Sequence, residues 1–325
     1  MITMSTNKVD FKETCMKYGI PVPQTYLCSN HITAEIYDKV QYPVFVKPLD
    51  ASGSRGAAIC NNRAELDAQF MIASEYSVTG NAIIEDCLVG TEFLLNYIAQ
   101  KGDFRLISVF DRYKCEDRGS FMNFSNLAIA PSRFISNYLN NMNDKVIHMF
   151  KSLGFTDGLI FLQGFFNGEK ITFYEMGCRL GGSYTILEKA CLGCDTVDMM
   201  AKYALSGKMV DNINDYPVDG ANYKNIAITI NYLLKGKKNI IAKIKGIEEI
   251  KSMPSVVGTE QLLFEGDSYD FAIDKTFDRA IFSIYLVVKD KAQMINDINY
   301  MNEIFDVINE KGESIVAMKY NPSII

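Results

Sequence analysis

The 325-residue chain is 48% hydrophobic and 22% charged, so it can bury a substantial core and divide into two or three lobes. Its formal net charge of −6 argues against a nucleic-acid backbone as the main partner. No apolar run reaches the roughly eighteen residues that a membrane span needs, and the N-terminus lacks a signal-peptide core, so we expect a cytoplasmic protein without a membrane partner.

The first 90 residues predict alternating short helices and strands. Helical spacing begins after Ser5 or Thr6, either of which would cap the helix, and it ends at Gly19. The sequence then predicts strands at 24–28, 42–48, 57–61 and 81–86 and helices at 33–41 and 62–74, the second helix capped by Asn61 or Asn62.

The middle of the chain predicts two hairpins, each followed by helix. Residues 91–115 read as a long hairpin that turns at Lys101-Gly102-Asp103, and residues 158–177 read as another that turns at Asn167-Gly168. Residues 132–154 form the stretch with the strongest helical pattern, and residues 184–207 also read as helix.

A domain boundary is predicted near residue 215. The segment 208–225 is polar and carries Pro217 and Gly220, which favour a loop. We therefore expect a first domain at 1–215, with a subdomain at about 20–88, and a small domain at 216–325. The small domain predicts strands near 224–234 and 282–288 and a final helix at 291–312.

Cysteine and histidine do not supply an obvious reactive site. Of the eight cysteines, only Cys191 and Cys194 form a CxxC pair, and no second pair completes a zinc site. The two histidines, His31 and His148, lie in separate segments, so a Ser-His-Asp triad does not find its parts. We expect reduced, buried thiols.

A lysine and a Gly/Ser loop suggest a phosphate site. Lys47 ends an apolar strand, and the loop after it contains Ser52, Gly53, Ser54 and Gly56, which allow backbone N–H groups to turn toward an anion. The lysine precedes the glycines, an order that excludes the GxxxxGK[ST] phosphate loop. A simple turn between two strands is the competing interpretation of this loop.

Two acidic residues at strand ends suit a nucleoside. Glu85 closes one apolar strand and Glu92 opens the next. Backbone groups between them could pair with an adenine edge, and a carboxylate suits the hydroxyls of a ribose. On this local pattern alone, two solvent-facing acids are the preferred interpretation.

The stretch FYEMGCRLGGS combines a carboxylate, a guanidinium and three glycines. Gln163 and Glu175 lie on the two strands of the hairpin that turns at Asn167-Gly168, and their spacing places them across the pair and on one face. Two oxygen ligands on one face suit Mg²⁺. Arg179 follows closely enough to donate to a transferring phosphoryl group.

These motifs, in this order over about residues 7–205, resemble the ATP-grasp superfamily, most closely the branch of the carbamoyl-phosphate synthetase large subunit and biotin carboxylase. The stretches that carry the resemblance are TNKVDFKETCMKYGIPVP, YPVFVKPLDASGSRGAAI, AIIEDCLVGTE, GLIFLQGFF and FYEMGCRLGGS. The resemblance implies an α+β ATP-grasp fold in which two α+β lobes sandwich ATP, with a small C-terminal α+β domain like that of carboxylase-type members.

The resemblance assigns a role to each candidate residue. The residues implied to bind the nucleotide are Lys8 and Lys47 with the loop residues Ser52, Gly53, Ser54 and Gly56 at the phosphates, Glu85, Asp86 and the backbone around Leu88 at adenine, and Glu92 at ribose. Gln163 and Glu175 would bind Mg²⁺, whereas Arg179 and Lys47 would act on the transferring phosphoryl group. ATP and Mg²⁺ are therefore the expected cofactors.

The chain departs from the family pattern in three places. Gln163 stands where many members have an acid, although carbamoyl-phosphate synthetase resembles this sequence in using Gln there. Gly177 stands where members commonly carry Asn in an ExNxR motif, which removes one metal ligand and implies weaker metal binding. Such proteins also begin with a Rossmann-like domain of roughly a hundred residues, which this chain lacks, so it looks like part of a longer protein.

Two functions from different classes follow. The first is a carboxylate-amine ligase that forms an acyl phosphate and releases ADP and phosphate, acting on small carboxylate and amine substrates, with a homodimer as one assembly to test. Its acceptor would lie against residues 110–133, where Arg112, Lys114 and Arg118 are candidate carboxylate partners and a solvated loop is the alternative. The second is a nucleotide-binding or regulatory module without turnover.

Overall fold

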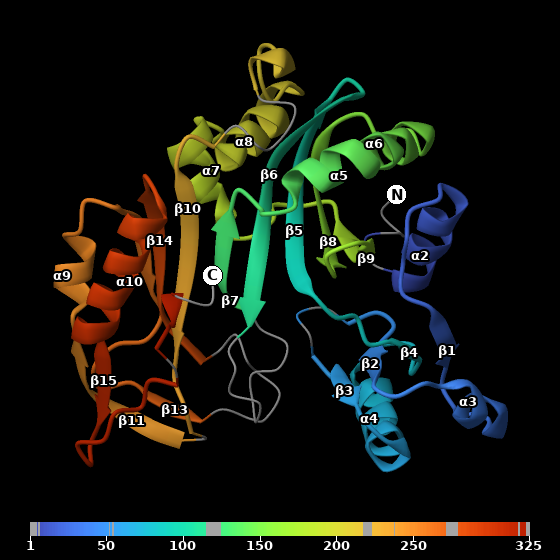
Figure 1. The fold of residues 1–325 in the computed structure, drawn as a ribbon, viewed down its shortest axis with the longest axis horizontal. Coiled ribbons are helices and arrows are strands. Elements are labelled where there is room, and N and C mark those ends of the chain that lie inside the picture. Colours follow the sequence, from blue (N-terminus) through green and yellow to red (C-terminus); the bar gives the residue numbers. More distant parts are fainter. Residues whose placement is uncertain are drawn as a thin grey trace. The chain divides into compact units, whose positions relative to one another are not determined.

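A computed structural model describes residues 5, 7–51, 53, 55–114, 125–216, 223–236, 238–270, 279–317 and 319–322 (Figure 1). The chain forms two compact units that interleave along the sequence. The first unit comprises Met1–Val109, Ser132–Gly181 and Asp198–Ala221, and the second comprises Phe110–Pro131, Gly182–Val197 and Asn222–Ile325. The expected division at residue 215 and the 20–88 subdomain stay predictions.

The first unit contains a four-stranded antiparallel sheet in the order β1-β4-β2-β3. Its strands are β1 (Thr25–Ser29), β2 (Val44–Pro48), β3 (Ala58–Cys60) and β4 (Ala82–Asp86). The helices α3 (Ala34–Lys39) and α4 (Arg63–Tyr76) pack against it. Alternate residues such as Val44, Val46 and Ile84 join Leu66 and Phe70 in its core, which fixes the face that each strand buries.

A second sheet of the first unit has the strand order β6-β5-β8-β9. It is built from β5 (Thr91–Gln100), β6 (Asp103–Lys114), β8 (Gly158–Phe166) and β9 (Ile171–Gly177), and β6 continues into the second unit. The unit also holds α2 (Lys8–Lys17), α5 (Ile135–Asn141), α6 (Asn143–Ser152), α8 (Thr196–Ser206) and the 3₁₀ turn Ile213–Asp215. Aromatic residues dominate the core under α2, α5 and α6, and Phe93, Tyr97 and Phe173 are fully buried there.

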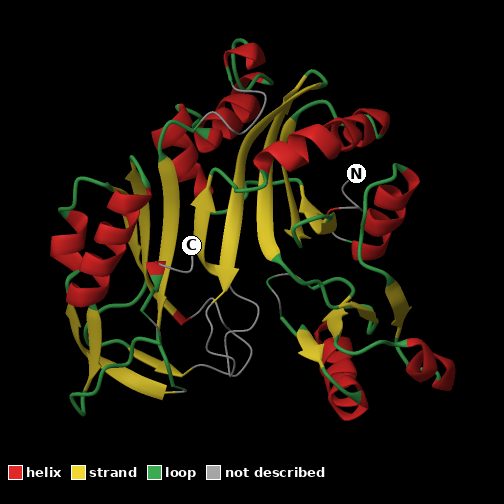
Figure 2. Ribbon diagram, viewed as in Figure 1, coloured by secondary structure: helices red, strands yellow, loops and turns green. Residues whose placement is uncertain are grey.

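The second unit continues the strand order as β12-β14-β10-β7-β6 and adds a small sheet in the order β13-β11-β15. Its strands are β7 (Ser125–Ala130), β10 (Ile226–Leu233), β11 (Lys238–Lys245), β12 (Val256–Gln261), β13 (Ser268–Asp270), β14 (Ala280–Val288) and β15 (Asp306–Asn309). Its helices are α7 (Tyr184–Leu192), α9 (Ile247–Lys251) and α10 (Lys291–Ile304). Figure 2 shows the helices and strands of each unit.

The α+β architecture and both predicted hairpins are confirmed. Lys101 and Gly102 have φ of 53° and 81° at the first turn, as a two-residue hairpin loop requires. In the second hairpin, Asn167 Oδ1 accepts hydrogen bonds from the backbone N–H groups of Glu169 and Lys170. Of the two caps proposed for α4, Asn62 is the one that the structure shows, because its Oδ1 accepts from the N–H of Glu65 at 3.0 Å.

Four expectations are wrong in detail. Asn7, not Ser5 or Thr6, caps α2, because its Oδ1 accepts from the N–H of Val9 at 2.9 Å. The helical pattern at 132–154 breaks at Met142 into α5 and α6, and the pattern at 184–207 breaks at Gly193, whose φ of 67° ends α7. The final helix ends at Ile304, and Asp306–Asn309 pairs instead with β11.

Within the parts of the chain that the structure describes, no helix combines the length and hydropathy that crossing a membrane requires.

Candidate functional site

Lys8 holds the start of the Gly/Ser loop. It occupies the first position of α2, and its Nζ donates to the carbonyl oxygens of Leu49 at 3.2 Å and Ala51 at 2.7 Å. Burial lowers the pKa of Lys8, an effect that the nearby Glu175 carboxylate opposes. The predicted phosphate ligand Lys8 therefore already lies beside the loop that the sequence assigned to phosphates.

Two glycines of this loop adopt backbone conformations that other residues avoid. Gly53 and Gly56 have φ of +70° and +64°. A Cβ on Gly56 would also lie 2.8 Å from Cδ2 of Tyr76, so a side chain does not fit there. The other two predicted loop residues, Ser52 and Ser54, lie outside the described residues.

A buried cluster joins Glu85 to two lysines. Glu85 lies on β4 directly opposite Phe45, and Lys47 lies two residues further along β2 on the same face, so the two charged side chains meet diagonally across the strands. Lys47 Nζ lies 2.5 Å from Glu85 Oε1, and Lys12 Nζ, from α2, bonds Glu85 Oε2. Lys12 also donates to Thr25 Oγ1 at 2.9 Å.

The charges of this cluster depend on one another. Lys12 and Glu85 are each 3% exposed and Lys47 is 5% exposed. Burial by itself would raise the pKa of Glu85, but the neighbouring Lys47 and Lys12 hold it below its ordinary value of 4.5. Burial lowers the pKa of Lys12, and Glu85 opposes that effect. Glu85 is thus a charged carboxylate that needs its ammonium partners.

Tyr174 links this cluster to two other predicted residues. Lys47 Nζ lies 5.7 Å from the centre of the Tyr174 ring and 5.8 Å from that of Phe45, within range of cation–π attraction. The Tyr174 hydroxyl donates to Glu92 Oε1 at 2.7 Å and lies 3.3 Å from Gln163 Oε1. Residues predicted for phosphate, ribose and metal therefore surround one tyrosine.

The predicted alignment of Gln163 and Glu175 is confirmed. They are direct partners in the β8–β9 pair, and the register shifts immediately beyond Gln163, which leaves Tyr174 as an extra residue on β9. Both side chains are half-buried, so an ion could reach them. One carboxylate and one amide oxygen, completed by phosphate and water, fit a single Mg²⁺ ion.

Gly177 adds no side-chain ligand beside Glu175. Over the described portion of the chain, no group of three or more His, Cys, Asp or Glu side chains is arranged to hold a metal. Glu175 and its cross-strand partner Gln163 stay the residues that the sequence predicts for Mg²⁺.

Phe161 fills the space beside Gly177 and supports Arg179. A Cβ on Gly177 would lie 2.2 Å from Cε1 of the Phe161 ring, so a side chain at position 177 would force this buried ring to move. The Arg179 guanidinium carbon lies 4.6 Å above the centre of the same ring, and Arg179 Nη1 donates to the Leu180 carbonyl at 2.9 Å. The absence of a side chain at Gly177 thus leaves space for the Phe161 ring, and the exposed Arg179 guanidinium packs on that ring.

The predicted adenine residues lie at the end of β4. Asp86 accepts a hydrogen bond from the Tyr26 hydroxyl at 2.7 Å, so its carboxylate is already engaged. Leu88 is half-buried in the segment that follows, and Glu92 is buried at the start of β5. The Glu85 carboxylate already pairs with Lys12 and Lys47, so an adenine would form its hydrogen bonds there with backbone groups.

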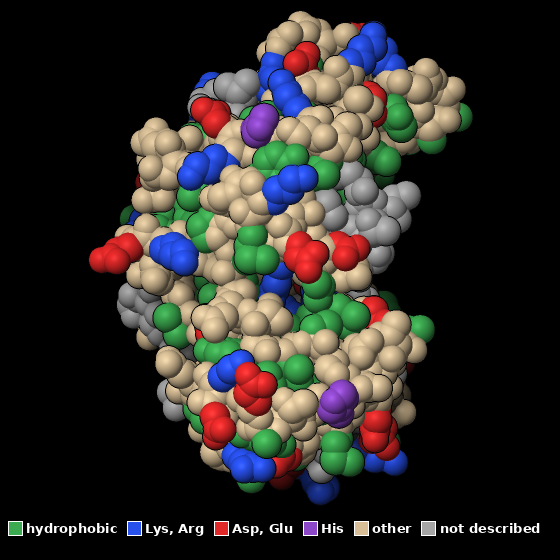
Figure 3. All heavy atoms as spheres, turned by 90° about the vertical axis from the view of Figure 1, so that its right-hand side faces the viewer, with side chains coloured by type: hydrophobic (Ala, Val, Ile, Leu, Met, Phe, Trp, Pro, Cys, Tyr) green, Lys and Arg blue, Asp and Glu red, His purple; other side chains and the backbone are tan. Residues whose placement is uncertain are grey.

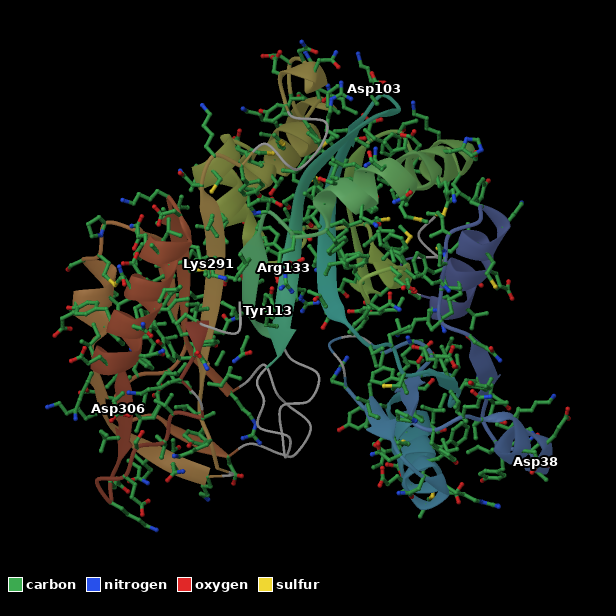
Figure 4. All side chains as sticks on the ribbon, viewed as in Figure 1. Asp38, Asp103, Tyr113, Arg133, Lys291 and Asp306 are labelled. Carbon is green, nitrogen blue, oxygen red and sulfur yellow. The ribbon has the colours of Figure 1, made fainter. Side chains whose placement is uncertain are left out.

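Arg133 is the last residue of the segment 110–133 proposed for the acceptor, of which the structure describes residues 110–114 and 125–133. Figure 4 labels this residue. Its Nη2 donates to Oγ1 of Thr91, which lies immediately before Glu92 on β5, at 3.2 Å. Arg118 lies outside the described residues, as does the side chain of Lys114. The acceptor role of residues 110–133 stays a prediction.

Sequence reasoning missed three residues of this site. Lys12 lies one helical turn after Lys8, a spacing that could have indicated a shared face. Tyr174 directly precedes Glu175, and its role depends on a bulge that no local pattern announces. Phe161 lies among the apolar residues of β8, and nothing in the sequence separates it from ordinary core.

Comparison with known proteins gives one family match. Residues 7–212 match the family described as carbamoyl-phosphate synthase L chain, ATP binding domain. Among curated proteins, the carbamoyl phosphate synthase large chain, N-terminal section, of Methanopyrus kandleri is 22% identical over 355 aligned positions. The alignment covers 98% of this chain but 62% of that relative.

Solved structures show the same fold. The L-amino acid ligase from Bacillus licheniformis has a TM-score of 0.74 at 17% identity, covering 94% of this chain and 72% of that chain. The biotin carboxylase domain of the Hydrogenobacter thermophilus 2-oxoglutarate carboxylase, solved with MgADP, ADP and bicarbonate, has a TM-score of 0.72 at 16% identity, covering 94% and 67%. The predicted ATP-grasp fold is therefore confirmed.

Proposed function

The chain belongs to the carbamoyl-phosphate synthase L chain ATP-binding domain family, and on that premise we propose that it is an ATP-dependent carboxylate-amine ligase. In this reaction a carboxylate oxygen takes the γ-phosphoryl group of ATP, which gives an acyl phosphate and ADP. An amine then attacks the acyl carbon, phosphate leaves, and the nitrogen loses a proton.

The contact between Tyr174 and three candidate residues carries this proposal. Its ring lies against Lys47, and its hydroxyl contacts both Glu92 and Gln163. Residues suited to a phosphate, a ribose and a metal thereby lie around one side chain, an arrangement that supports the binding of one nucleotide. An isolated turn or an isolated acid at a strand end would not have these links.

Each side chain contributes binding or charge neutralisation. Lys47 would hold the phosphates, Glu92 the ribose, and Gln163 with Glu175 a Mg²⁺ ion. When bound, that ion neutralises phosphate charge during transfer. Arg179, supported by Phe161, would donate to the transferring phosphoryl group.

A nucleotide-binding module without turnover is the second candidate. The observation that favours it is the Phe161 ring, which fills the space beside Gly177, where family members commonly carry a metal-binding Asn. Such a module would bind nucleotide through Lys47 and Glu92 and release no ADP.

Trapping of the acyl phosphate distinguishes the two candidates. The chain is incubated with MgATP, hydroxylamine and a panel of carboxylic acids, because hydroxylamine converts an acyl phosphate to a hydroxamate. We expect ADP, phosphate and a hydroxamate. AMP and pyrophosphate as products would reject the ligase, and tight nucleotide binding without turnover would support the non-catalytic module.

A further inference from the structure

Glu85 has a separate ammonium partner for each carboxylate oxygen. Lys47 approaches Oε1 from the adjacent strand β2, and Lys12 bonds Oε2 from helix α2. Lys12 is also held by Thr25 Oγ1 at 2.9 Å, which fixes its position independently of Lys47. The cluster therefore contains one more cation than its carboxylate needs.

This excess bears on how Lys47 could bind phosphate. Its ammonium is 2.5 Å from Glu85 Oε1 in the structure, so contact with a phosphate would weaken or break that ion pair. A fully buried carboxylate that loses its sole partner is strongly disfavoured. Lys12 is placed to remain on Glu85 when Lys47 moves, and Thr25, the other residue to which it donates a hydrogen bond, is uncharged.

We propose that Lys12 is a positioning residue that neutralises Glu85 and so allows Lys47 to turn to the phosphates of a bound nucleotide. The inference rests on the proposed function, because it takes from it the role of Lys47. Lys12 itself does not touch the nucleotide. Among the described residues, only Lys12 and Lys47 form ion pairs with Glu85, so removal of Lys12 leaves Lys47 as its remaining ion-pair partner and ties Lys47 to the carboxylate.

A purely structural lysine would act differently. If Lys12 served only to hold α2 against the sheet, its loss would weaken every ligand of the site to the same extent. The positioning role instead predicts a loss confined to ligands that carry phosphate, and it predicts that removal of the Glu85 charge restores them.

The test compares three ligands by calorimetry in the presence of magnesium: ADP, inorganic pyrophosphate and adenosine. For Lys12→Met we expect at least a tenfold loss of affinity for ADP and pyrophosphate and less than a twofold change for adenosine. Glu85→Gln added to Lys12→Met should return ADP affinity to within about threefold of wild type, because no carboxylate then holds Lys47.

Lys17→Met is the matched control, since Lys17 is exposed on the same helix and its loss changes the net charge equally. It should leave all three affinities unchanged. Thermal melts verify folding, and Lys12→Gln, which keeps a donor for Thr25 and Glu85 without the charge, replaces Lys12→Met if that variant does not fold.

The outcomes separate the two proposals. Equal losses for all three ligands, or no loss for ADP, would overturn the role of Lys12 while leaving nucleotide binding intact. Failure of the added Glu85→Gln change to restore ADP would also overturn it. A wild-type protein that binds none of the three ligands would refute the proposed function and this inference with it.

Discussion

The Tyr174 hydroxyl donates a 2.7 Å hydrogen bond to Glu92 Oε1, and this bond joins β9 to β5 although β8 lies between them in the sheet. The long tyrosine side chain spans the intervening strand because the bulge in the β8–β9 pair sets it out of register. The same ring lies beside Lys47, so one side chain orders three parts of the site. On the face of the molecule that Figure 3 shows, acidic and basic side chains are interspersed, which contrasts with the concentrated buried charge of the site.

Tyr174→Phe keeps the ring against Lys47 and removes the bond to Glu92. Because a hydrogen bond to a charged group contributes about 1.5–3 kcal/mol, we expect the free energy of unfolding to fall by that amount in urea denaturation. Tyr300→Phe, on the exposed side of α10, should change it by less than about 0.5 kcal/mol. Equal effects of the two substitutions would contradict the link.

The Glu85 cluster predicts a specific acid sensitivity. The pKa of Glu85 is lower in the folded protein than its ordinary value of 4.5 because Lys47 and Lys12 face it, so the folded state favours the charged form. This stabilisation is fully present above pH 4.5 and is lost as the pH falls through the lower, folded-state value. Unfolding free energy measured between pH 6 and pH 3 should fall less steeply for Glu85→Gln than for wild type.

At neutral pH the same substitution should be costly. Glu85→Gln leaves two buried ammonium groups without their carboxylate, and loss of one partner from a buried ion pair costs about 3–5 kcal/mol. The cluster would not be ionised as described if Glu85→Gln were as stable as wild type at pH 7 and its unfolding free energy fell equally steeply between pH 6 and pH 3.

Glu175→Gln tests the metal anchor. The substitution preserves shape at a half-buried position, so the fold should persist and ADP should still bind weakly, whereas turnover should disappear because Mg²⁺ loses its carboxylate. Glu169→Gln, an exposed change in the turn of the same hairpin, should retain turnover. ADP release by Glu175→Gln at the wild-type rate would exclude this residue as the principal ligand.

Gly177→Asn should not simply restore a metal ligand. The Phe161 ring blocks even a Cβ at this position, so overpacking should cost about 1–3 kcal/mol and disturb the support of Arg179. Combining Gly177→Asn with Phe161→Ala should relieve part of that cost, which a double-mutant cycle of unfolding free energies measures. Additive effects of the two changes would rule out the steric coupling.

Features that depend on neighbouring residues could be predicted from the sequence. Asn167-Gly168 specifies a tight turn, and the two-residue period of the strands then places Gln163 opposite Glu175. Gly193 is also a helix-ending signal, and the structure ends α7 there. The prediction of one helix at 184–207 missed this end because it followed the apolar spacing, which continues beyond Gly193. The prediction of helix from the apolar spacing was also wrong at Asp306–Asn309, because these residues pair with β11 instead of continuing the helix.

The tertiary structure alone decided which charges meet and which space is filled. Lys12 and Glu85 are 73 positions apart, and no local pattern specifies that both are buried against Lys47. Likewise, Phe161 occupies the space beside Gly177 because the β8–β9 register makes the two residues direct partners. Backbone propensity and periodicity act over a few residues, whereas burial, ion pairing and steric exclusion depend on segments that the fold brings together.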